Sequence, residues 1–566
     1  MIELKINGKS VEADESASIF EAAESIGCKI PALCYHRNLS VYGGCRLCIV
    51  EIKGRSGFPI SCATPVEGGM EVFTHTPEIC EIRKNIFNLI IAYFPFECQL
   101  KCHSCASNNI CELRQLAEEM GINQMKFELI PRQGKMDDSS YAVKFDSSRC
   151  INCGRCSRVC REVQHVGIFT PSRRGPATQV TTFMDKGMGN VDCTGCGQCL
   201  LVCPVGAIQE NFKIDQVLEA IADPEKHVVV QVAPSVRFTI GEEFGCQPGV
   251  NLEKQMVTAL RKLDFNQIFD TVFTADLTIM EESAEFIKRF SEGGRLPLIS
   301  SCCPGWISFA EDHLPEMKEN LSTCKSPQQM FGALLKSYYA EKQELEQKDI
   351  VSVSVMPCTA KKSECMRPEM MENNIYDVDY VLTTRELASM IKSRGMHLPD
   401  LSESKYDAPF GITTGAGVLF GVSGGVMEAT LRTAYEVITK EELPKIEFDD
   451  VRGLDGIKSS EIDIKGTKIK VAVANGLENA WQLLKHADDY HFIEIMACTG
   501  GCIGGGGQPV SRDPECLQKR KNGLYKDDKN MTLRKSHKNP AVQKLYKEFL
   551  DHPLSEKSHH YLHVKL

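Results

Sequence analysis

The spacing of hydrophobic and polar residues changes several times along this chain, which indicates more than one domain. Residues 2–12 alternate apolar and polar side chains around Asn7-Gly8, a pattern typical of a β-hairpin. Residues 18–26 and 78–97 follow a helical period instead. From about residue 227, short β-branched runs alternate with helical stretches, and this predicts an α/β region. At 566 residues the chain is too long for one hydrophobic core.

Composition argues against some classes of function and favours metal binding over disulfides for the cysteines. The chain is 42% hydrophobic and 25% charged, as in ordinary globular proteins. Its net charge of -10 argues against nucleic-acid binding. No apolar run reaches the ~18–20 residues of a membrane span, and the N-terminus carries no export signal, so we expect a cytoplasmic protein. In that reducing compartment the 27 cysteines are expected to bind metal rather than form disulfides.

The clearest internal repeat is C-x2-C-x2-C-x3-C, at 150–160 and again at 193–203. The first three cysteines of such a run can hold three corners of one 4Fe–4S cube, while the fourth is directed to the other cube. Structural zinc is the alternative, but zinc sites seldom use two such evenly spaced runs. The first predicted cluster has the ligands Cys150, Cys153, Cys156 and Cys203, and the second has Cys193, Cys196, Cys199 and Cys160.

Two further cysteine groups precede this repeat. The spacing of the first is similar to that of a plant-type 2Fe–2S ferredoxin, with a longer first gap, and zinc or free thiols are the alternative. The second predicts another 4Fe–4S cluster. The first group is Cys34, Cys45, Cys48 and Cys62, and the second is Cys98, Cys102, Cys105 and Cys111. The cysteines that fit no pattern are interpreted as buried free thiols, namely Cys28, Cys80, Cys246, Cys365 and Cys516.

Three motifs in the second half of the chain carry four more candidate ligands. They read S-S-C-C-P-G-W at 300–306, M-P-C-T-A-K-K at 356–362 and E-I-M-A-C-T-G-G-C-I-G-G-G-G-Q-P at 494–509. Each follows a predicted strand, where open α/β sheets build their sites. The glycines suit backbone packed against a bulky cofactor. The candidate ligands are Cys303, Cys358, Cys498 and Cys502.

Three other residues near these motifs suggest proton transfer. Cys302 is left over from metal ligation, so its thiol could carry a proton. Glu282 and Glu285 lie three residues apart and share one face of a predicted helix. The alternative for the two carboxylates, which sequence alone favours, is an ordinary solvated helix face.

The three motifs, their order and the upstream cluster modules resemble the iron-only (FeFe) hydrogenases, over nearly the whole chain. The closest resemblance is to monomeric clostridial enzymes with four accessory clusters. It implies a multidomain α+β fold: a β-grasp 2Fe–2S ferredoxin domain at 1–77, a small helical domain with one 4Fe–4S cluster at 78–127, a bacterial 2x4Fe–4S ferredoxin domain at 128–209, and a large two-lobed α/β catalytic domain at 210–566. The Lys-rich tail from about 515 is expected to form helices on a solvated surface.

The resemblance also implies the cofactor and the residue roles. The four ligands of the motifs would bind the 4Fe–4S cube of an H-cluster, and Cys502 would bridge it to a diiron subsite with CO, cyanide and azadithiolate. Lys361 would donate to a cyanide, as suits a compact ammonium. Protons would pass through Cys302, Glu282, Ser322, Glu285 and Arg289. The pocket would be shaped by Ala233, Pro234, Ser235, Gln328, Met356, Phe420 and Met496.

One position departs from the family pattern. Where the third accessory cluster typically has a histidine ligand, this chain has Cys98, and His103 stands at the wrong spacing. We therefore expect four cysteine ligands, whose extra negative charge should lower the cluster potential. Histidine couplings in the EPR spectrum of this cluster would contradict that. Cys324 lies near Ser322, and core packing is its expected role.

The expected activity is the reversible reduction of protons to H2, with a ferredoxin or flavodoxin as redox partner, maturation proteins for the diiron subsite, and a monomeric chain. Two other classes compete with it. A hydrogen sensor or iron–sulfur assembly relative commonly alters the relay cysteine, which is present here as Cys302. A front subunit of an NADH-oxidising complex would share the cluster modules, but no convincing flavin or nucleotide loop is visible.

Overall fold

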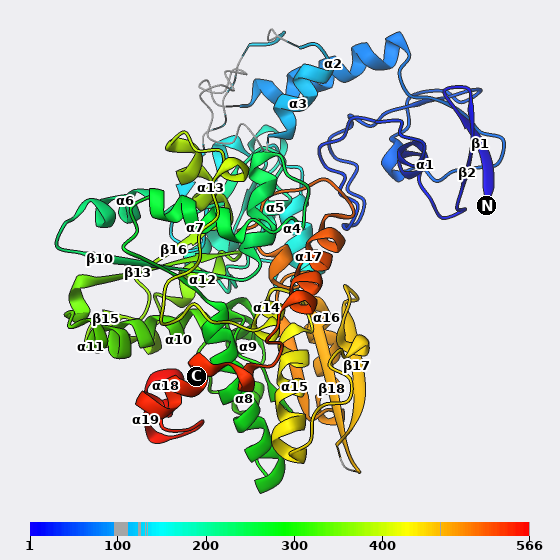
Figure 1. Ribbon diagram of the computed structural model, residues 1–566. Coiled ribbons are helices and arrows are strands. Elements are labelled where there is room, and N and C mark those ends of the chain that lie inside the picture. The colour runs from blue at the N-terminus through cyan, green and yellow to red at the C-terminus, as the bar shows by residue number, and fades with distance from the viewer. Residues whose placement is uncertain are drawn as a thin grey trace.

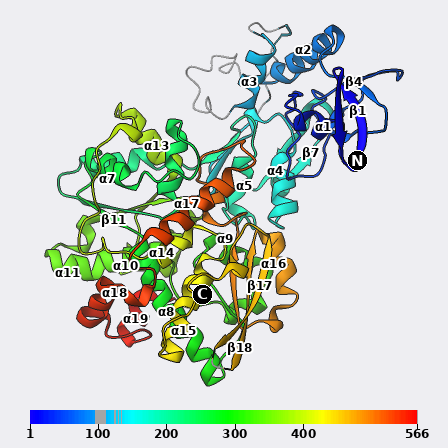
Figure 2. The same ribbon diagram turned by 45° about the vertical axis from the view of Figure 1, so that its right-hand side comes forward.

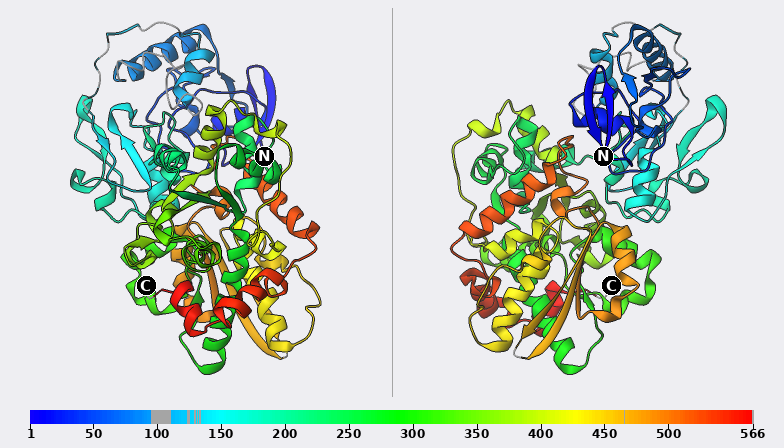
Figure 3. Two further views of the ribbon diagram at one scale, coloured as in Figure 1. Left: turned by 60° about the vertical axis from the view of Figure 1, so that its left-hand side comes forward. Right: turned by 90° about the vertical axis from the view of Figure 1, so that its right-hand side faces the viewer.

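The computed structural model describes residues 1–94, 111–122, 126–128, 130, 132, 134–464 and 466–564 (Figure 1). Three cysteines of the predicted third accessory cluster, Cys98, Cys102 and Cys105, lie outside these residues. Figure 2 and Figure 3 show the N-terminal modules gathered at one end of a larger part that contains two central sheets. No helix among the described residues combines the length and apolar character that a membrane crossing requires.

The first module is a four-stranded sheet beside one helix, as the sequence predicts. Its strands are β1 (Ile2–Ile6), β2 (Lys9–Ala13), β3 (Glu51–Ile52) and β4 (Glu71–Phe73), in the order β2-β1-β4-β3. Asn7 and Gly8 both have positive φ, which the predicted tight hairpin turn requires. Helix α1 (Ile19–Ser25) begins at a capping box in which Ser18 and Glu21 bind each other's backbone N–H groups.

The second and third modules share one hydrophobic cluster. Helices α2 (Pro77–Ala92) and α3 (Glu112–Glu119) contribute Phe87 and Leu113, and the neighbouring three-stranded sheet contributes Phe145. That sheet has the order β5-β6-β9, and its module adds the hairpin β7-β8 and the short helices α4 and α5. Their bounds are β5 (Met136–Asp137), β6 (Val143–Asp146), α4 (Arg155–Arg158), β7 (Thr170–Ser172), β8 (Gln179–Thr181), α5 (Gln198–Leu201) and β9 (Ile208–Glu210).

The larger part has two lobes, each built on a four-stranded sheet. The first sheet is entirely parallel, in the order β11-β10-β13-β16. The second has the order β12-β19-β18-β17 and is parallel except for the β17–β18 pair. The strands are β10 (His227–Val232), β11 (Gln267–Asp270), β12 (Leu298–Ile299), β13 (Ile350–Met356), β16 (Tyr380–Thr383), β17 (Ile457–Ile464), β18 (Thr467–Asn475) and β19 (Phe492–Met496).

Helices cover both sheets. Buried residues of α7 and α13 pack on the first sheet, and those of α9, α15 and α16 pack on the second. The remaining described helices surround them, together with a small hairpin of β14 (Met371–Glu372) and β15 (Ile375–Tyr376). The bounds are α6 (Ile214–Ala222), α7 (Glu253–Lys262), α9 (Pro304–His313), α10 (Pro327–Leu334), α11 (Ala340–Gln343), α12 (Ala360–Glu364), α13 (Thr384–Ser393), α14 (Gly415–Val418), α15 (Gly425–Thr439) and α16 (Leu477–Leu484).

Helix α8 (Val272–Glu292) lies between the two lobes. Its residues Phe273 and Leu277 pack in a cluster with β10 and β11 of the first lobe, while Phe286 packs with Phe492 of the second. The helix ends at Gly293, whose positive φ forms the left-handed C-cap. Because both lobes hold it, α8 can fix side chains at their boundary.

The expectation of a solvated tail is wrong. The tail consists of α17 (Cys516–Asn530), α18 (Pro540–Leu545) and α19 (Glu556–Leu562), joined by short turns. Leu545, Leu550 and Leu562 are fully buried in the cluster that contains α8 and α10. The lysine-rich composition hides this, because a few apolar residues at helical spacing are enough to anchor each helix.

A buried ionic network fastens α17 to α15. The Arg432 guanidinium donates to both Asp528 oxygens at 2.9 Å and to Glu428 at 2.6 Å, and all three side chains are almost fully buried. Replacing Arg432 by alanine is expected to lower stability by about 3 kcal/mol, because it leaves buried carboxylates without this partner. Calorimetry should show a lower melting temperature for this variant. Lys445→Ala, which removes an exposed ion pair with Asp449, should leave the melting temperature unchanged. Equal melting temperatures for the two variants would contradict the prediction.

Candidate functional site

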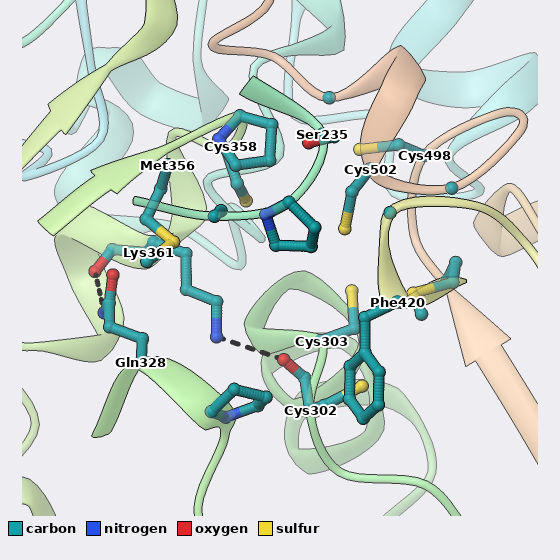
Figure 4. Close-up of a pocket in the computed structure, with 18 of the residues that line it drawn as sticks. Ser235, Cys302, Cys303, Gln328, Met356, Cys358, Lys361, Phe420, Cys498 and Cys502 are labelled. Atoms are coloured by element: carbon teal, nitrogen blue, oxygen red, sulfur yellow. Dashed lines mark hydrogen bonds between the residues drawn. The ribbon is translucent and has the colours of Figure 1, made fainter. Parts of the chain in front are cut away.

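Four strand ends meet at one cavity between the lobes. Residues 233–235 follow β10, Cys302 and Cys303 follow β12, Cys358 follows β13, and Cys498 follows β19. The space free of protein atoms in and around this cavity is about 740 Å³, open solvent included. Its lining contains all the residues predicted for the H-cluster pocket and all four ligands predicted for its cube, and Figure 4 labels most of them. These lining residues are Ala233, Pro234, Ser235, Gln328, Met356, Phe420, Met496, Lys361, Cys302, Cys303, Cys358, Cys498 and Cys502.

The four candidate ligand thiols fit an iron–sulfur cube. The sulfur atoms of Cys303, Cys358 and Cys502 face the same space in Figure 4. Burial raises the pKa of the Cys498 thiol well above its usual value, and the neighbouring Cys358 raises it further. Burial also raises the pKa of Cys358 to about 12. Thiols gathered in such a dry space are costly to ionise unless iron compensates their charge, which is the donor set that an iron–sulfur cluster uses.

Lys361 reaches into this cavity from α12. Its ammonium donates to the Cys302 carbonyl at 3.1 Å (Figure 4) and to both Glu364 oxygens at 2.9 and 3.0 Å. Although burial lowers the pKa of Lys361, the Glu364 carboxylate outweighs it and the pKa is raised. The side chain therefore remains a cation at the cavity wall, where it can bind an anionic group of a cofactor.

The residues predicted for proton transfer on α8 lie in a buried polar group beside the cavity. Glu282 and Glu285 are buried, with exposed fractions of 1% and 7%, so the solvated interpretation of this helix face is wrong. Ser322 donates to Glu285 at 2.7 Å, and Arg289 donates to the other Glu285 oxygen at 2.6 Å. Burial, followed by the Glu285 and Glu494 charges, raises the pKa of Glu282 to about 8.

Cys302 stands at the inner end of this path. Burial raises the pKa of its thiol well above the usual range, and the Glu282 carboxylate raises it further, so the two groups interact. One Glu282 oxygen, Oε2, is buried without a hydrogen-bond partner among the described residues. A buried carboxyl oxygen without a partner is free to form a new hydrogen bond, as a group that exchanges protons must.

The structure adds residues that the sequence interpretation missed. Thr271 and Ala275 line the cavity from the end of β11 and the start of α8, and the strand-end rule could have found them. Glu494 accepts backbone N–H groups of Gly424 and Met427, both at 2.7 Å, and so fixes the start of α15. The other additional lining residues adjoin the motifs and are Pro304, Pro327, Pro357, Gly421, Ala497, Gly501 and Gly505.

The glycine-rich loop is glycine-rich mainly because other backbone segments touch it. A Cβ on Gly501 would lie 2.5 Å from the Ser423 nitrogen, and one on Gly505 would lie 2.3 Å from the Pro357 oxygen. A Cβ on Gly506 would lie 2.4 Å from the oxygen of Cys196 in the ferredoxin-like module. The expected contact with a cofactor is thus only part of the reason, and the loop also joins two modules.

The accessory cysteines gather as the spacing predicts, as far as they are described. Cys34 lies 3.4 Å from Cys45, and Cys48 lies 3.3 Å from Cys62, between sulfur atoms. Two such pairs suit a 2Fe–2S cluster, in which each iron takes two thiolates. Cys150, Cys153, Cys156 and Cys203 line a second cavity together. Charges on Cys196, Cys193 and Cys160 all act on Cys199, whose pKa burial raises first of all.

The loop that carries Cys193, Cys196 and Cys199 contacts the motifs of the main cavity directly. Thr359, next to Cys358, donates to the Gly195 carbonyl at 2.7 Å, and Gln198 donates to the Gly504 carbonyl at 2.9 Å. The cysteine group of the second run therefore adjoins the wall of the cavity. The fold and the site together define an iron–sulfur redox protein with a buried metal centre between two α/β lobes.

Comparison with known proteins identifies the family within this class. Residues 226–506 match the C-terminal domain of the iron-only hydrogenase large subunit, and residues 514–565 match the iron hydrogenase small subunit. Residues 1–77 match a 2Fe–2S cluster binding domain, and residues 143–209 match a 4Fe–4S dicluster domain. The chain belongs to the iron-only (FeFe) hydrogenase family, whose cofactors are iron–sulfur clusters and an H-cluster.

Individual relatives cover most or all of the chain. The NADP-reducing hydrogenase subunit HndD of Solidesulfovibrio fructosivorans is 44% identical over 100% of this chain and 98% of its own length. Iron hydrogenase 1 of Clostridium pasteurianum is 39% identical over 99% of both chains. A solved structure of the FeFe hydrogenase HydA(deltaEFG) is 44% identical, covers 62% of this chain and 98% of its own, and has a TM-score of 0.57.

Proposed function

We propose that this protein interconverts protons and H2 at the cavity between its lobes, with electrons that enter through the accessory clusters from a ferredoxin-type donor. The observation that carries the proposal is the meeting of three systems at one cavity. Four candidate ligand thiols line it, Cys302 and the buried carboxylates of α8 lead protons towards it, and the loop of Cys196 contacts its glycine-rich wall. Excluding water from such a site keeps protons on the defined route.

The proposal assigns separate roles to the residues of the cavity. Cys303, Cys358, Cys498 and Cys502 hold the H-cluster, which supplies the redox-active iron when it is bound. Cys302 gives protons to the site and takes them from it, and Glu282 exchanges protons with Cys302. Ser322, Glu285 and Arg289 continue the path outward through the hydrogen bonds already described. Lys361 holds an anionic cofactor group, and the remaining lining residues exclude water.

The proposed cofactor set is one 2Fe–2S cluster, three accessory 4Fe–4S clusters and the H-cluster. The paired thiols Cys34–Cys45 and Cys48–Cys62 support the first, and the two gathered groups of the repeat support two of the others. The third accessory 4Fe–4S cluster, with Cys98 in place of histidine, stays a prediction. Cys111 is the one predicted ligand of that cluster among the described residues, and it is buried at the start of α3.

Infrared and activity measurements on anaerobically matured protein test the proposal. We expect absorption bands of CO and cyanide, together with H2 evolution from reduced viologen. Cys498→Ala should lose both signals, because the cube loses a ligand, while Cys246→Ala should keep both, because Cys246 lies outside the cavity lining. Fully matured protein without the bands and without H2 evolution would rule the proposal out.

The electron donor requires its own test, because one relative that spans the whole chain is named as an NADP-reducing hydrogenase subunit. We expect reduced ferredoxin alone to sustain H2 evolution by the purified chain. NADPH is expected to act only after an additional NADP-binding subunit is supplied. H2 evolution from NADPH and the purified chain alone would overturn the assignment of a ferredoxin-type donor.

Gly506→Ala tests the electron path between the modules. The new Cβ would lie 2.4 Å from the Cys196 oxygen and 2.7 Å from the Gly197 Cα, two backbone atoms of the facing loop, so the two loops must separate. Ferredoxin-driven H2 evolution is expected to fall about tenfold, as remote misplacement can cost up to about a hundredfold. Gly68→Ala is the control, since nothing lies within 4 Å of its Cβ. Unchanged rates in both variants would show that the contact is unimportant.

A further inference from the structure

A second group of metal-binding side chains lies at the outer part of the relay. The carboxylate of Glu285, the thiol of Cys324 and the imidazole of His563 each offer one donor atom, and these atoms all lie within 4.8 Å of one another. The Cys324 sulfur is 3.9 Å from Glu285 Oε2 and 4.0 Å from His563 Nδ1. The three side chains are buried, with exposed fractions of 7%, 2% and 8%.

The backbone holds this group in place. Glu285 comes from α8, which both lobes support, while Cys324 and His563 face each other across an isolated antiparallel bridge. Lys325 donates its N–H to the Leu562 carbonyl at 2.7 Å, and Val564 donates its N–H to the Thr323 carbonyl at 2.8 Å. The end of the C-terminal segment is thus tied to the segment that follows the relay serine.

The second ring nitrogen of His563, Nε2, contacts a carboxylate, as it commonly does in histidines that bind metal. His563 Nε2 lies 3.0 Å from Glu281 Oε2, and Glu281 is held by Tyr546 and Ser558 at 2.5 Å each. A histidine that ligates metal usually donates its other N–H to a carboxylate, which fixes the ring and its tautomer. With Nε2 bound to Glu281, the lone pair of Nδ1 faces Cys324 and Glu285. This observation is independent of the donor cluster itself.

The donor set and the spacing suit zinc. Thiolate, imidazole and carboxylate are its usual ligands, and tetrahedral binding places neighbouring donor atoms about 3.5 Å apart. The two separations from the Cys324 sulfur, 3.9 and 4.0 Å, therefore need only a few tenths of an ångström of closure, and the Glu285 and His563 donor atoms lie within 4.8 Å of each other. The Thr323 hydroxyl, 2.8 Å from Nδ1, must turn away or supply the fourth ligand.

The charges around the group also balance. Glu281 and Glu285 contribute two negative charges and the Arg289 guanidinium one positive charge, 2.6 Å from Glu285 Oε1. A divalent cation that displaces the Cys324 proton brings the sum to neutral. The exposed ring of His559 lies 4.4 Å from the ring of His563, between centroids, and offers an entry ligand at the surface.

We propose that Glu285, Cys324 and His563 form a zinc-binding site that closes the proton path. Glu285 Oε2, the oxygen that would bind zinc, is the one that accepts the Ser322 hydroxyl at 2.7 Å. Zinc at Oε2 displaces that hydrogen bond and replaces a proton acceptor by a cation. The effect on turnover rests on the proposed function, whereas the site itself does not.

Zinc content and zinc coordination test the site without reference to turnover. Anaerobic holoenzyme is treated with zinc sulfate and desalted, and metal analysis is expected to show one more zinc per chain in the wild type than in Cys324→Ala or His563→Gln. Cys365→Ala and His560→Gln are matched controls that should bind as the wild type does. X-ray absorption at the zinc edge should show one sulfur ligand at about 2.3 Å and nitrogen or oxygen ligands at about 2.0 Å. Equal zinc in all five proteins would overturn the site.

Hydrogen evolution from reduced viologen tests the closing of the path. Zinc is expected to slow the wild type and both controls at least tenfold, EDTA should reverse this, and the two site variants should resist it. Zinc that binds with the expected ligands without slowing turnover would leave the site standing and overturn its link to proton transfer. Loss of H2 evolution in every protein before zinc is added would instead count against the proposed function.

Discussion

Replacing Cys302 by alanine is expected to lower H2 evolution by about 10²- to 10⁴-fold, the range by which a positioned acid–base group accelerates a reaction. The thiol lines the cavity and interacts with Glu282, so its removal takes away the titratable side chain that connects the cavity with this buried carboxylate. The four proposed cube ligands, among them the neighbouring Cys303, remain in place. The cofactor should therefore be intact while its proton supply is interrupted.

The comparison of rate with spectrum makes the Cys302→Ala result specific. Viologen-driven H2 evolution gives the rate, and the CO and cyanide bands should keep their intensity. Cys365→Ala is the matched control, because it removes an equally buried thiol from the hydrophobic core of the first lobe, outside the cavity lining. A Cys302→Ala variant with normal bands and a normal rate would refute the proton-carrying role.

Replacing Glu282 by glutamine is expected to have opposite effects on activity and stability. The amide cannot exchange a proton with Cys302, so H2 evolution should fall by about 10²-fold or more. The wild-type rate should itself decline above about pH 8, because the pKa of Glu282 is raised to about 8 and the ionised form can no longer donate. A pH profile of H2 evolution measures this limb directly.

The stability effect follows from the two protonation states. The pKa of Glu282 is about 8 in the folded protein, against an ordinary value of 4.5. Between these pH values the unfolded carboxyl is ionised while the folded one keeps its proton, so the native state loses stability as the pH rises. Glutamine does not titrate, so the variant should melt about 2 °C or more above the wild type at pH 8. This difference should vanish near pH 4.

An exposed glutamate on the same helix provides the control for Glu282. Glu292 lies at the end of α8 and is exposed, so Glu292→Gln should change neither the rate nor the melting temperature. If Glu282→Gln evolves H2 at the wild-type rate, the path does not pass through this carboxylate. A lower melting temperature at pH 8 would show that the carboxyl stabilises the fold instead of straining it.

Much of the site could be predicted because its chemistry is written in local spacing. The repeated C-x2-C-x2-C-x3-C runs determine which cysteines share a cube, and the cavity lined by Cys150, Cys153, Cys156 and Cys203 agrees with that pairing. The strand-end positions of Cys303, Cys358 and Cys498 were also predictable, because β-branched runs precede them and parallel strands end at the same edge.

The environment of the carboxylates could not be predicted in this way. Helical spacing places Glu282 and Glu285 on one face, but the same spacing describes a solvated face equally well. Only the packing of α8 between two lobes buries them and raises the pKa of Glu282. The buried tail was missed for a related reason, because its partners lie more than two hundred residues away in the sequence.

The sequence by itself determined the family, the order of the modules and the candidate ligand sets. These depend on short spacings and on motifs that keep their meaning in any surroundings. Tertiary structure alone decided which carboxylates are dry, which loops touch, and that Glu285, Cys324 and His563 meet. These depend on contacts between distant segments, and burial, which sets the charge of each group, is a property of the assembled core.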